Sequence, residues 1–379
     1  MSELLVSALE ASADLHGAAV LRELRALRPG LRAFGAGGPR MRAEGFEALA
    51  RAEDLSVMGI AEVIPALPRI FEAMDALLDA ARERRPRAAL LIDSPDFNLR
   101  LARRLRERHV PVAYFIGPSV WAWRTYRVRQ IARDVARMLV ILPFEAKFYE
   151  QHRVRATYVG NPLADRLLQA GATENPLENP LSIRKGSPVL ALLPGSRAQE
   201  IRRIWPPMLA AARALKAARP DLQLVVPVAP TIDKAQLEKA DIENVTLIDG
   251  RAPDVLAAAD AAIVASGTAT LEAALAGTPM VVVYRTSWLT WLIGRLLVRV
   301  RHVSLVNLLA GHTLVPELLQ SQCTPDRIAS AAAPLLAETP ERAAQLVGLE
   351  ALKAQLAPKG ARPAARRVAE EVLLLLEAP

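Results

Sequence analysis

The sequence predicts an α/β fold with two doubly wound parallel sheets, and three observations support this class. Short apolar runs alternate with helix-like segments almost from end to end, which is typical of parallel sheets wrapped by helices. Residues 171–187 interrupt this rhythm with Gly, Pro and Asn, and the alternation then restarts. The 379 residues also suit two domains of about 150 residues or more each. We therefore expect two facing domains, 1–170 and 188–340, joined by a linker at 171–187.

The first half contains six candidate strands separated by segments with helical periodicity. The expected strands are Leu4–Leu9, Leu31–Gly35, Ala88–Ile92, Val112–Ile116, Arg137–Leu142 and Thr157–Val159. The clearest helical segments between them are Leu15–Arg28, Glu62–Arg84 and Leu99–Arg108.

The second half restarts the same alternation and then becomes helical. Its expected strands are Val189–Leu193, Leu222–Val228, Val245–Ile248, Ala261–Ala265 and Met280–Tyr284. The chain has helical periodicity from about Pro325 to Glu377. We expect the helices of 341–379 to pack back on the first domain or on a partner chain, which makes a homodimer one option.

Composition excludes several classes of protein. Apolar residues make up 52% and charged residues 23%, so neither a disordered nor a collagen-like chain is expected. The single cysteine, Cys323, cannot form an internal disulfide, which favours a reduced, cytoplasmic setting. The longest stretches without Asp, Glu, Lys or Arg have 15 residues, fewer than the roughly 18 to 20 of a membrane-spanning helix. Glu3 stands where a signal peptide would carry basic residues, so export is not expected.

The charge balance indicates an anionic partner. Lys and Arg number 48 against 40 Asp and Glu, a net charge of +8. Phosphorylated metabolites, an acidic membrane face and nucleic acid all suit such a charge, and a codon-driven preference for Arg is the simpler explanation. The sequence has no Lys/Arg-rich tail and no basic segment interleaved with aromatic residues, so nucleic acid is the least expected partner.

In open parallel sheets, ligands bind beyond the carboxyl ends of the strands, so the residues that follow each apolar run are candidate site residues. Glu10, Ser12 and Asp14 follow the first run; they could bind substrate, or Ser12 or Asp14 could cap a helix. The nearby Gly35–Met41 turn has Arg40 at the last glycine position of a dinucleotide fingerprint, so that match is weak.

Two aspartates follow the buried run 88–92. A carboxylate at the mouth of a sheet can act as a general base if it is within hydrogen-bond reach of a hydroxyl. Asp96 follows Pro95 and precedes a helical segment, so we expect an N-cap there. Asp93 is then the candidate base, with a structural hydrogen-bond acceptor as the alternative.

Two strand-to-helix turns in the second half are candidate nucleotide sites. Gly195, Ser196 and Arg197 combine a helix start with a guanidinium, which suits a pyrophosphate, although Glu200 could instead close a capping box. The second turn offers small residues for close phosphate approach and an acidic side chain for ribose hydroxyls, at Ser266, Gly267, Thr268 and Glu272. A small-residue contact between helix and sheet is the simpler reading of that turn. No Gly-Lys-Ser/Thr motif occurs here, which excludes a P-loop.

We expect no metal and no cofactor. The sequence has no Asp-x-Asp motif, and its histidines show no ligand-like spacing of three to five residues. The charge on a leaving nucleotide diphosphate would then be stabilised by Arg197 and helix dipoles.

Nine short motifs, taken together in this order, carry a family resemblance. They lie at residues 10–14, 37–41, 55–63, 92–98, 118–124, 142–145, 159–165, 194–197 and 266–272. Over residues 4 to about 320 the chain closely resembles the lipid-A-disaccharide synthase family. The resemblance implies two Rossmann-like domains of the GT-B type and a metal-free inverting glycosyltransferase. Such an enzyme joins UDP-2,3-diacylglucosamine to 2,3-diacylglucosamine 1-phosphate (lipid X), forming a β-1,6 linkage and releasing UDP.

The resemblance also implies roles for individual residues. Asp93 falls on the essential aspartate, the base for the acceptor's 6-hydroxyl. Arg197 falls on an arginine that contacts UDP, and Asn307 on an asparagine needed for activity. Leu9 and Ala13 replace usual glycines and Val306 a usual proline; each glycine replacement adds a Cβ that bears on how the acceptor fits. Alternatives within the GT-B class are a UDP-sugar 2-epimerase and a transferase to another lipid acceptor.

Acylated substrates would require contact with a bilayer, and one segment has a suitable pattern. In residues 288–301, one helical stripe carries Trp288, Trp291, Arg295 and Arg299. A core helix with two snorkelling arginines is the alternative. Trp121 and Trp123 are further lipid-contact candidates, with burial of their rings as the alternative. We expect a cytoplasmic enzyme attached peripherally to the anionic inner face of the cytoplasmic membrane.

Overall fold

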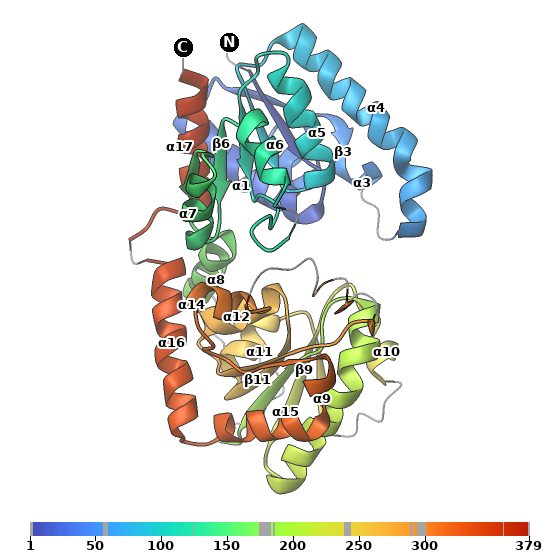
Figure 1. Cartoon of the computed structure of the whole chain (residues 1–379), viewed down its shortest axis with the longest axis vertical. Coiled ribbons are helices and arrows are strands. Elements are labelled where there is room, and N and C mark those ends of the chain that lie inside the picture. Colours follow the sequence, from blue (N-terminus) through green and yellow to red (C-terminus); the bar gives the residue numbers. More distant parts are fainter. Residues whose placement is uncertain are drawn as a thin grey trace. The chain divides into compact units, whose positions relative to one another are not determined.

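The computed structural model describes residues 3–55, 60–123, 125–173, 183–184, 186–238, 244–288, 291–292, 294, 301–358 and 360–377. The chain forms two compact units (Figure 1). Unit 1 comprises Met1–Pro162 and Gly360–Pro379, and unit 2 comprises Leu163–Lys359. The division after Pro162 differs from the expected boundary at 170, because most of helix α8 (Pro162–Thr173) belongs to unit 2. The expected linker 171–187 begins inside α8, and most of it lies outside the described residues.

The described part of unit 1 contains a seven-stranded parallel sheet in the order β3-β2-β1-β4-β5-β6-β7. Its strands are β1 Glu3–Ala8, β2 Arg32–Gly37, β3 Glu47–Arg51, β4 Ala88–Ile92, β5 Val112–Phe115, β6 Arg137–Val140 and β7 Ala156–Tyr158. The strand order reverses direction between β1 and β4, which pair with Ala8 opposite Ile92. Ligands of doubly wound sheets bind at such a reversal, so the segments after Ala8 and Ile92 lie where a site is expected.

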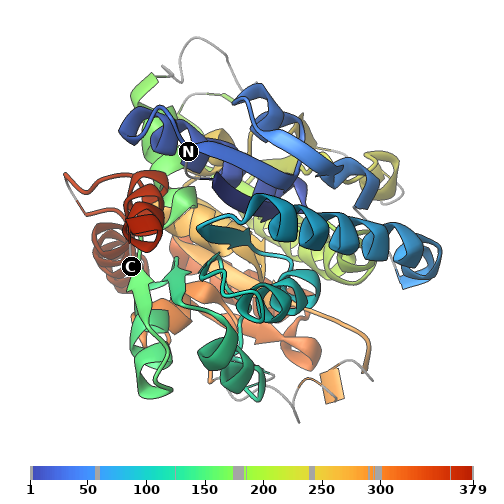
Figure 2. The ribbon, with the colours of Figure 1, turned by 90° about the horizontal axis from the view of Figure 1, so that it is seen from above.

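Helices cover both faces of this sheet (Figure 2). They are α1 Ala11–Leu27, α2 Pro39–Ala43, α3 Ala52–Leu55, α4 Ile60–Arg84, α5 Pro95–Arg106, α6 Arg127–Asp134, α7 Pro143–Gln151 and α17 Ala364–Glu377. Alternate residues of β1 point to opposite faces: Leu5 packs in the core under α4 and α5, whereas Leu4 packs in the core under α1 and α17.

The described part of unit 2 contains a six-stranded parallel sheet in the order β10-β9-β8-β11-β12-β13. Its strands are β8 Val189–Leu193, β9 Gln223–Val228, β10 Val245–Asp249, β11 Ala261–Ala265, β12 Met280–Tyr284 and β13 Glu317–Leu319. The helices are α8, α9 Ala198–Ala218, α10 Ala235–Glu238, α11 Ala252–Ala258, α12 Thr268–Ala276, α14 Leu305–Ala310, α15 Pro325–Ala332 and α16 Pro340–Leu356, with 3₁₀ turns at Gln320–Gln322 and Ala333–Leu336. Two parallel α/β sheets and a helical C-terminal segment thus confirm the predicted fold class.

The two C-terminal helices divide between the units. Helix α16 stays with unit 2, where Gln345 accepts a hydrogen bond from the backbone N–H of Met280 at 2.8 Å and Leu349 is fully buried. Only α17 returns to unit 1, where it packs on α1 and Arg366 pairs with Glu23 at 3.2 Å. Of the helices expected to pack back on the first domain or on a partner chain, α17 thus packs within unit 1, whereas α16 packs within unit 2. Within the described ranges, no helix is long and apolar enough to cross a membrane.

Candidate functional site

The turn after β4 holds Asp93 in a strained backbone conformation. Asp93 and Ser94 have φ of +53° and +44°, and each non-glycine residue in this left-handed region costs about 1 kcal/mol or more. The Asp93 carbonyl accepts hydrogen bonds from the Tyr114 hydroxyl at 2.6 Å and from the Asn98 side-chain amide at 2.9 Å. The backbone N–H of Asp93 donates to the Phe115 carbonyl at 3.0 Å. The backbone of the turn is thus held by partners on β5 and α5.

The Asp93 carboxyl lies in a partly buried, negatively charged environment. Burial raises its pKa above the usual aspartate range, and the negative charge of Glu10 raises the pKa further, against a smaller lowering by the Ser94 N–H. Glu10 follows β1 and accepts a hydrogen bond from the Ser94 hydroxyl at 3.2 Å. A carboxylate with a raised pKa is a stronger base, so this edge of the sheet suits removal of a proton from a hydroxyl.

Asp14 and Ser12, both predicted as substrate-binding, have different surroundings. The Asp14 carboxylate is buried and accepts backbone hydrogen bonds from Gly38, Arg40 and Met41 at 2.9, 2.9 and 3.0 Å. It therefore caps α2, a different helix from the one that carries it. Ser12 is exposed in the first turn of α1, at the same edge as Glu10.

Asp96 is not the N-cap that the sequence predicts. Ser94 occupies that position of α5, and Asp96 lies in the first turn, where it pairs with Arg127 at 2.5 Å. Asp96 is largely exposed. The helix instead begins at Pro95, because proline is favoured at the first helical position, and Ser94 is therefore the N-cap.

A buried carboxylate near the same edge escaped sequence reasoning. Glu145 accepts hydrogen bonds from the Trp121 indole N–H at 3.0 Å and from the Leu142 backbone N–H at 3.1 Å. Burial raises the pKa of Glu145 to about 7 despite these donors. The Trp121 ring meets Phe144 edge-on, with centroids 4.9 Å apart, so structural packing explains Trp121. The available signal was a glutamate at the third position of a helix that follows a strand.

In unit 2, the turn after β8 presents Arg197 to solvent. Arg197 is the N-cap residue of α9, and its side chain is 80% exposed, 3.4 Å from Glu200. The Glu200 carboxylate also accepts a hydrogen bond from the Ser196 backbone N–H at 3.0 Å. Gly195 has φ +117°, and a Cβ there would lie 2.5 Å from Glu200. One of the N–H groups predicted to face a pyrophosphate therefore already has a carboxylate partner, whereas the guanidinium is accessible.

The turn after β11 combines exposed small residues with a half-buried acid. Gly267 is the N-cap of α12, and both Gly267 and Thr268 are exposed. The Ser266 hydroxyl donates to the Val303 carbonyl at 3.3 Å. Glu272 lies one turn along α12; burial raises its pKa, and Arg166, 3.6 Å away, opposes this shift. The space around Gly267 leaves room for a phosphate at the start of α12, and Glu272 lies about one turn further along the same helix.

Asn307 is fully buried, and its side chain has no hydrogen-bonding capacity left. Its amide nitrogen donates to the Val315 carbonyl at 2.9 Å and to Glu317 at 2.7 Å. Its amide oxygen accepts from the backbone N–H groups of Leu314 and Val315 at 2.8 and 2.9 Å. An asparagine side chain has two donors and two acceptor sites, and all four are used. The side chain of Asn307, predicted as catalytic, thus bonds to Leu314, Val315 and Glu317.

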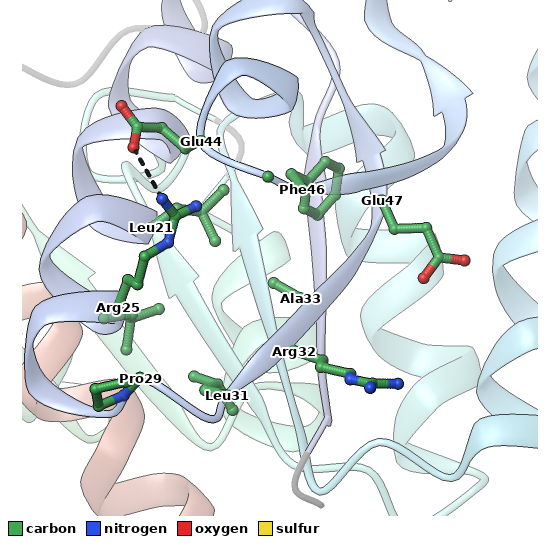
Figure 3. A pocket seen from close by; sticks show the side chains of 11 residues that line it. Leu21, Arg25, Pro29, Leu31, Arg32, Ala33, Glu44, Phe46 and Glu47 are labelled. Atoms are coloured by element: carbon green, nitrogen blue, oxygen red, sulfur yellow. Dashed lines mark ion pairs between the residues drawn. The ribbon is translucent and has the colours of Figure 1, made fainter.

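Other features lie away from these turns. A cavity of about 320 Å³ lies at the amino end of β2, between Arg25, Glu44 and Arg32 (Figure 3). Asp93 follows the opposite, carboxyl ends of the strands.

In the predicted lipid-contact segment, Trp288 is 75% exposed and Trp291 is half-buried, while Arg295 and Arg299 lie outside the described residues. Among the described residues, no three His, Cys, Asp or Glu side chains are grouped so that they could hold a metal ion.

Comparisons with known proteins agree over nearly the whole chain. A family model described as lipid-A-disaccharide synthetase matches residues 4–372. The lipid-A-disaccharide synthase of Anaeromyxobacter dehalogenans (strain 2CP-C) is 52% identical over 375 residues, covering 98% of this chain and 97% of that protein. The corresponding protein of Myxococcus xanthus (strain DK1622) is 50% identical with the same coverage.

Solved structures share the fold at low sequence identity. The kitacinnamycin glycotransferase superposes with a TM-score of 0.64 at 18% identity, covering 99% of this chain and 98% of that one. A UDP-N-acetylglucosamine 2-epimerase from Listeria monocytogenes gives 0.63 at 14% identity, covering 98% and 94%. The calicheamicin glycosyltransferase CalG4 gives 0.61 at 18% identity over all of both chains. These likenesses show the GT-B fold.

Proposed function

The chain belongs to the lipid-A-disaccharide synthetase family and is a glycosyltransferase, and from this premise we propose the reaction and the role of each site residue. The substrates are UDP-2,3-diacylglucosamine and 2,3-diacylglucosamine 1-phosphate (lipid X). The products are the β-1,6-linked disaccharide 1-phosphate and UDP. The strained, backbone-fixed turn that presents Asp93 beside Glu10 is the observation that carries this proposal.

Asp93 acts on the acceptor. Its carboxylate removes the proton of the 6-hydroxyl while that oxygen attacks the anomeric carbon of the donor, and the bond from that carbon to the diphosphate oxygen breaks with its electron pair leaving on UDP. The raised pKa of Asp93 makes the proton transfer more favourable. Attack opposite the leaving group inverts the anomeric centre and gives the β linkage. Glu10 and Ser12, at the same edge, contact the acceptor sugar.

The donor binds at the two turns of unit 2. Arg197 contacts the diphosphate, and its exposed guanidinium can form a bidentate pair with it. The backbone around Gly195 and Ser196 and around Ser266, Gly267 and Thr268 approaches the phosphate oxygens. Glu272 accepts the ribose hydroxyls. Charge that develops on the leaving UDP is thereby stabilised by Arg197 and by the helix starts of α9 and α12.

Asn307 and Asp14 hold these elements in place without touching substrate. Asn307 and Ser304 both bond to Glu317, which also accepts the Val303 N–H, and the Val303 carbonyl accepts the Ser266 hydroxyl. This network ties the segment before α14 to the Ser266 turn. Asp14 fixes the start of α2 against α1.

Both substrates carry acyl chains, so we place the protein peripherally at the anionic inner face of the cytoplasmic membrane, with Trp288 as one contact. The exposure of Trp288 supports this contact, because aromatic rings favour the interface between headgroups and acyl chains. We retain a homodimer as a further proposal, since α16 leaves Val347 74% exposed.

A product assay tests the reaction. The purified chain, given both acylated substrates, is expected to yield the disaccharide 1-phosphate and UDP in equal amounts by mass spectrometry. UDP without disaccharide would overturn the proposal and favour another UDP-sugar reaction, such as the 2-epimerisation catalysed by some proteins of this fold.

Asp93→Asn tests the role of the base. We expect turnover to fall at least a thousandfold with UDP affinity unchanged, because general-base catalysis contributes up to about 10⁴-fold. Asp96→Asn, three residues away and exposed, is the matched control and should retain activity. Equal activity of the Asp93 and Asp96 variants would remove Asp93 from the base role.

A further inference from the structure

Helices α5 and α6 lie parallel and side by side on one face of unit 1. Three contacts set their register: Arg127 pairs with Asp96 at 2.5 Å, the Gln130 side chain donates to the Leu99 carbonyl at 3.2 Å, and Arg106 pairs with Asp134 at 3.0 Å. These contacts run from the first turn to the last, so α6 lies beside α5 (Figure 1). The exposed residues of the two helices therefore adjoin one another.

This surface is densely basic. Residues 95–108 and 125–134 contain eight arginines against three carboxylates, a net charge of +5. The whole chain has a net charge of +8. One of the three carboxylates, Asp134, has a fully buried side chain between Arg106 and Arg133. The name arginine face is used here for the exposed residues Arg100, Arg103, Arg104, Arg108, Arg129 and Arg133.

Three members of the arginine face carry uncompensated charge. Within the described part of the chain, the guanidinium groups of Arg100, Arg104 and Arg129 form no ion pair. Arg103 pairs with Glu107 at 3.3 Å, but both side chains are largely exposed, so that pair is weak. Unpaired like charges repel one another in the folded protein, and an anionic partner removes this repulsion.

The arginine face continues into exposed aromatic rings and towards the acceptor turn. Tyr126 and Trp123, in the segment leading to α6, are 68% and 40% exposed. Helix α5 begins at Pro95, two residues after Asp93. Tyrosine and tryptophan rings next to basic side chains are typical of protein surfaces that lie on lipid headgroups.

We propose that the arginine face, with Tyr126 and Trp123, docks unit 1 onto a bilayer that contains anionic phospholipid. The proposal rests on the proposed function, because acylated acceptor molecules reside in that bilayer. It adds a surface on unit 1, separate from residues 288–301. The positive charge of the arginine face is distributed over two helices, which suits the plane of headgroups of a membrane. A single free phosphate would instead require several hydrogen-bond donors that point to one place. Docking here places the start of α5, and with it Asp93, next to the acceptor's headgroup.

Vesicle sedimentation of the full chain tests the docking surface. Vesicles contain either phosphatidylcholine alone or phosphatidylcholine with 30% phosphatidylglycerol, and the variant is Arg100→Gln, Arg104→Gln and Arg129→Gln. Each basic side chain near an anionic surface strengthens binding about fivefold, so the triple variant should lose at least tenfold in partition onto the anionic vesicles. The control removes three other exposed arginines, by Arg32→Gln, Arg155→Gln and Arg327→Gln.

The control triple variant should lose less than threefold, although its net charge is the same. A corresponding Arg→Lys triple variant should bind as the unaltered protein does, because it keeps the charge. Raising the salt from 0.05 to 0.5 M should release the unaltered protein, as screening shortens the range of the attraction. Equal losses in the two Gln variants, or tighter binding of the unaltered protein to duplex DNA than to anionic vesicles, would overturn the proposal.

Activity measurements separate this proposal from the proposed function. With substrates dispersed in neutral detergent micelles, the Arg100/Arg104/Arg129 variant should keep its kcat, whereas with substrates in anionic vesicles its rate should fall with its binding. If the unaltered protein makes no disaccharide in either medium, the proposed function fails while the sedimentation result still decides the docking surface. If the variant is as fast as the unaltered protein on anionic vesicles, the docking proposal is contradicted and the proposed function is not.

Discussion

The Tyr114 hydroxyl donates a 2.6 Å hydrogen bond to the backbone carbonyl of Asp93. Tyr114 lies on β5, the strand next to β4, and is fully buried. The bond therefore fixes the backbone of Asp93, since its acceptor is the peptide carbonyl and not the carboxyl group. A strained turn persists only where its surroundings fix it, so Tyr114 helps to keep Asp93 in place at the end of β4.

We expect Tyr114→Phe to lower kcat roughly ten- to a hundredfold, because small displacements of a reacting group are costly. Affinity for UDP should not change. The free energy of unfolding should fall by only about 1 kcal/mol, since Asn98 still bonds to the Asp93 carbonyl. Steady-state kinetics and urea unfolding measure the two effects.

Tyr149→Phe is the matched control. The Tyr149 hydroxyl is buried and makes no hydrogen bond with the described residues, so its removal should leave both kcat and stability intact. A Tyr114 variant with normal kcat would show that Asn98 and the β4–β5 pairing suffice to hold the turn.

The sequence predicts the continuous buried strands and the edge strands β7 and β10, but it does not predict the edge strands β3 and β13. The runs at 88–92 and 189–193 become β4 and β8 with the expected bounds, because every residue in them is buried. Strands β3 and β13 were missed, since EALAR and ELL are short, only partly buried and lack an apolar run.

The site residues likewise differ in how far their surroundings can be predicted from the sequence. Asp93 is predictable because its position depends on the strand directly before it. The partners of Asp14 lie 24 to 27 residues away, and those of Asn307 lie beyond the helix that carries it. Such roles depend on how separate elements pack, which residue spacing does not encode.

Glu10→Gln should shift the acidic limb of the pH–rate profile to lower pH. The charge of Glu10 raises the pKa of Asp93, so its removal lowers that pKa and keeps the base ionised further into acid. Glutamine still accepts the Ser94 hydrogen bond. The measurement is kcat/KM from pH 4 to 8; an unmoved limb would mean that another group controls it.

Arg197→Ala should weaken UDP binding about tenfold or more, because charge-assisted bonds to a phosphate contribute roughly 1.5–3 kcal/mol. Arg197 is exposed and weakly paired, so little stability should be lost. Isothermal titration with UDP measures the change, with Arg202→Ala, five residues along, as the control. Equal UDP affinity in both variants would exclude Arg197 from the donor site.

Asn307→Ala should destabilise unit 2 by about 3 kcal/mol, because it leaves two backbone N–H groups and the Glu317 carboxylate short of partners in the interior. Urea unfolding measures the loss. If Asn307 is a positioning residue, activity and UDP affinity should fall together with thermal stability. A normal unfolding curve with a large loss of kcat alone would instead show that Asn307 acts on the substrate.

Glu145 should make the protein less stable as the pH rises. Burial raises the pKa of Glu145 to about 7 in the folded chain, against about 4.5 when unfolded. The folded state therefore binds more protons between these values, and its free energy of unfolding falls by roughly 3 kcal/mol from pH 4.5 to 7 through this group alone. Urea unfolding at several pH values should show this slope, and Glu145→Gln should flatten it. Glu150→Gln, on the exposed side of α7, should leave the slope unchanged, and an equally steep slope in the Glu145 variant would assign the effect to another group.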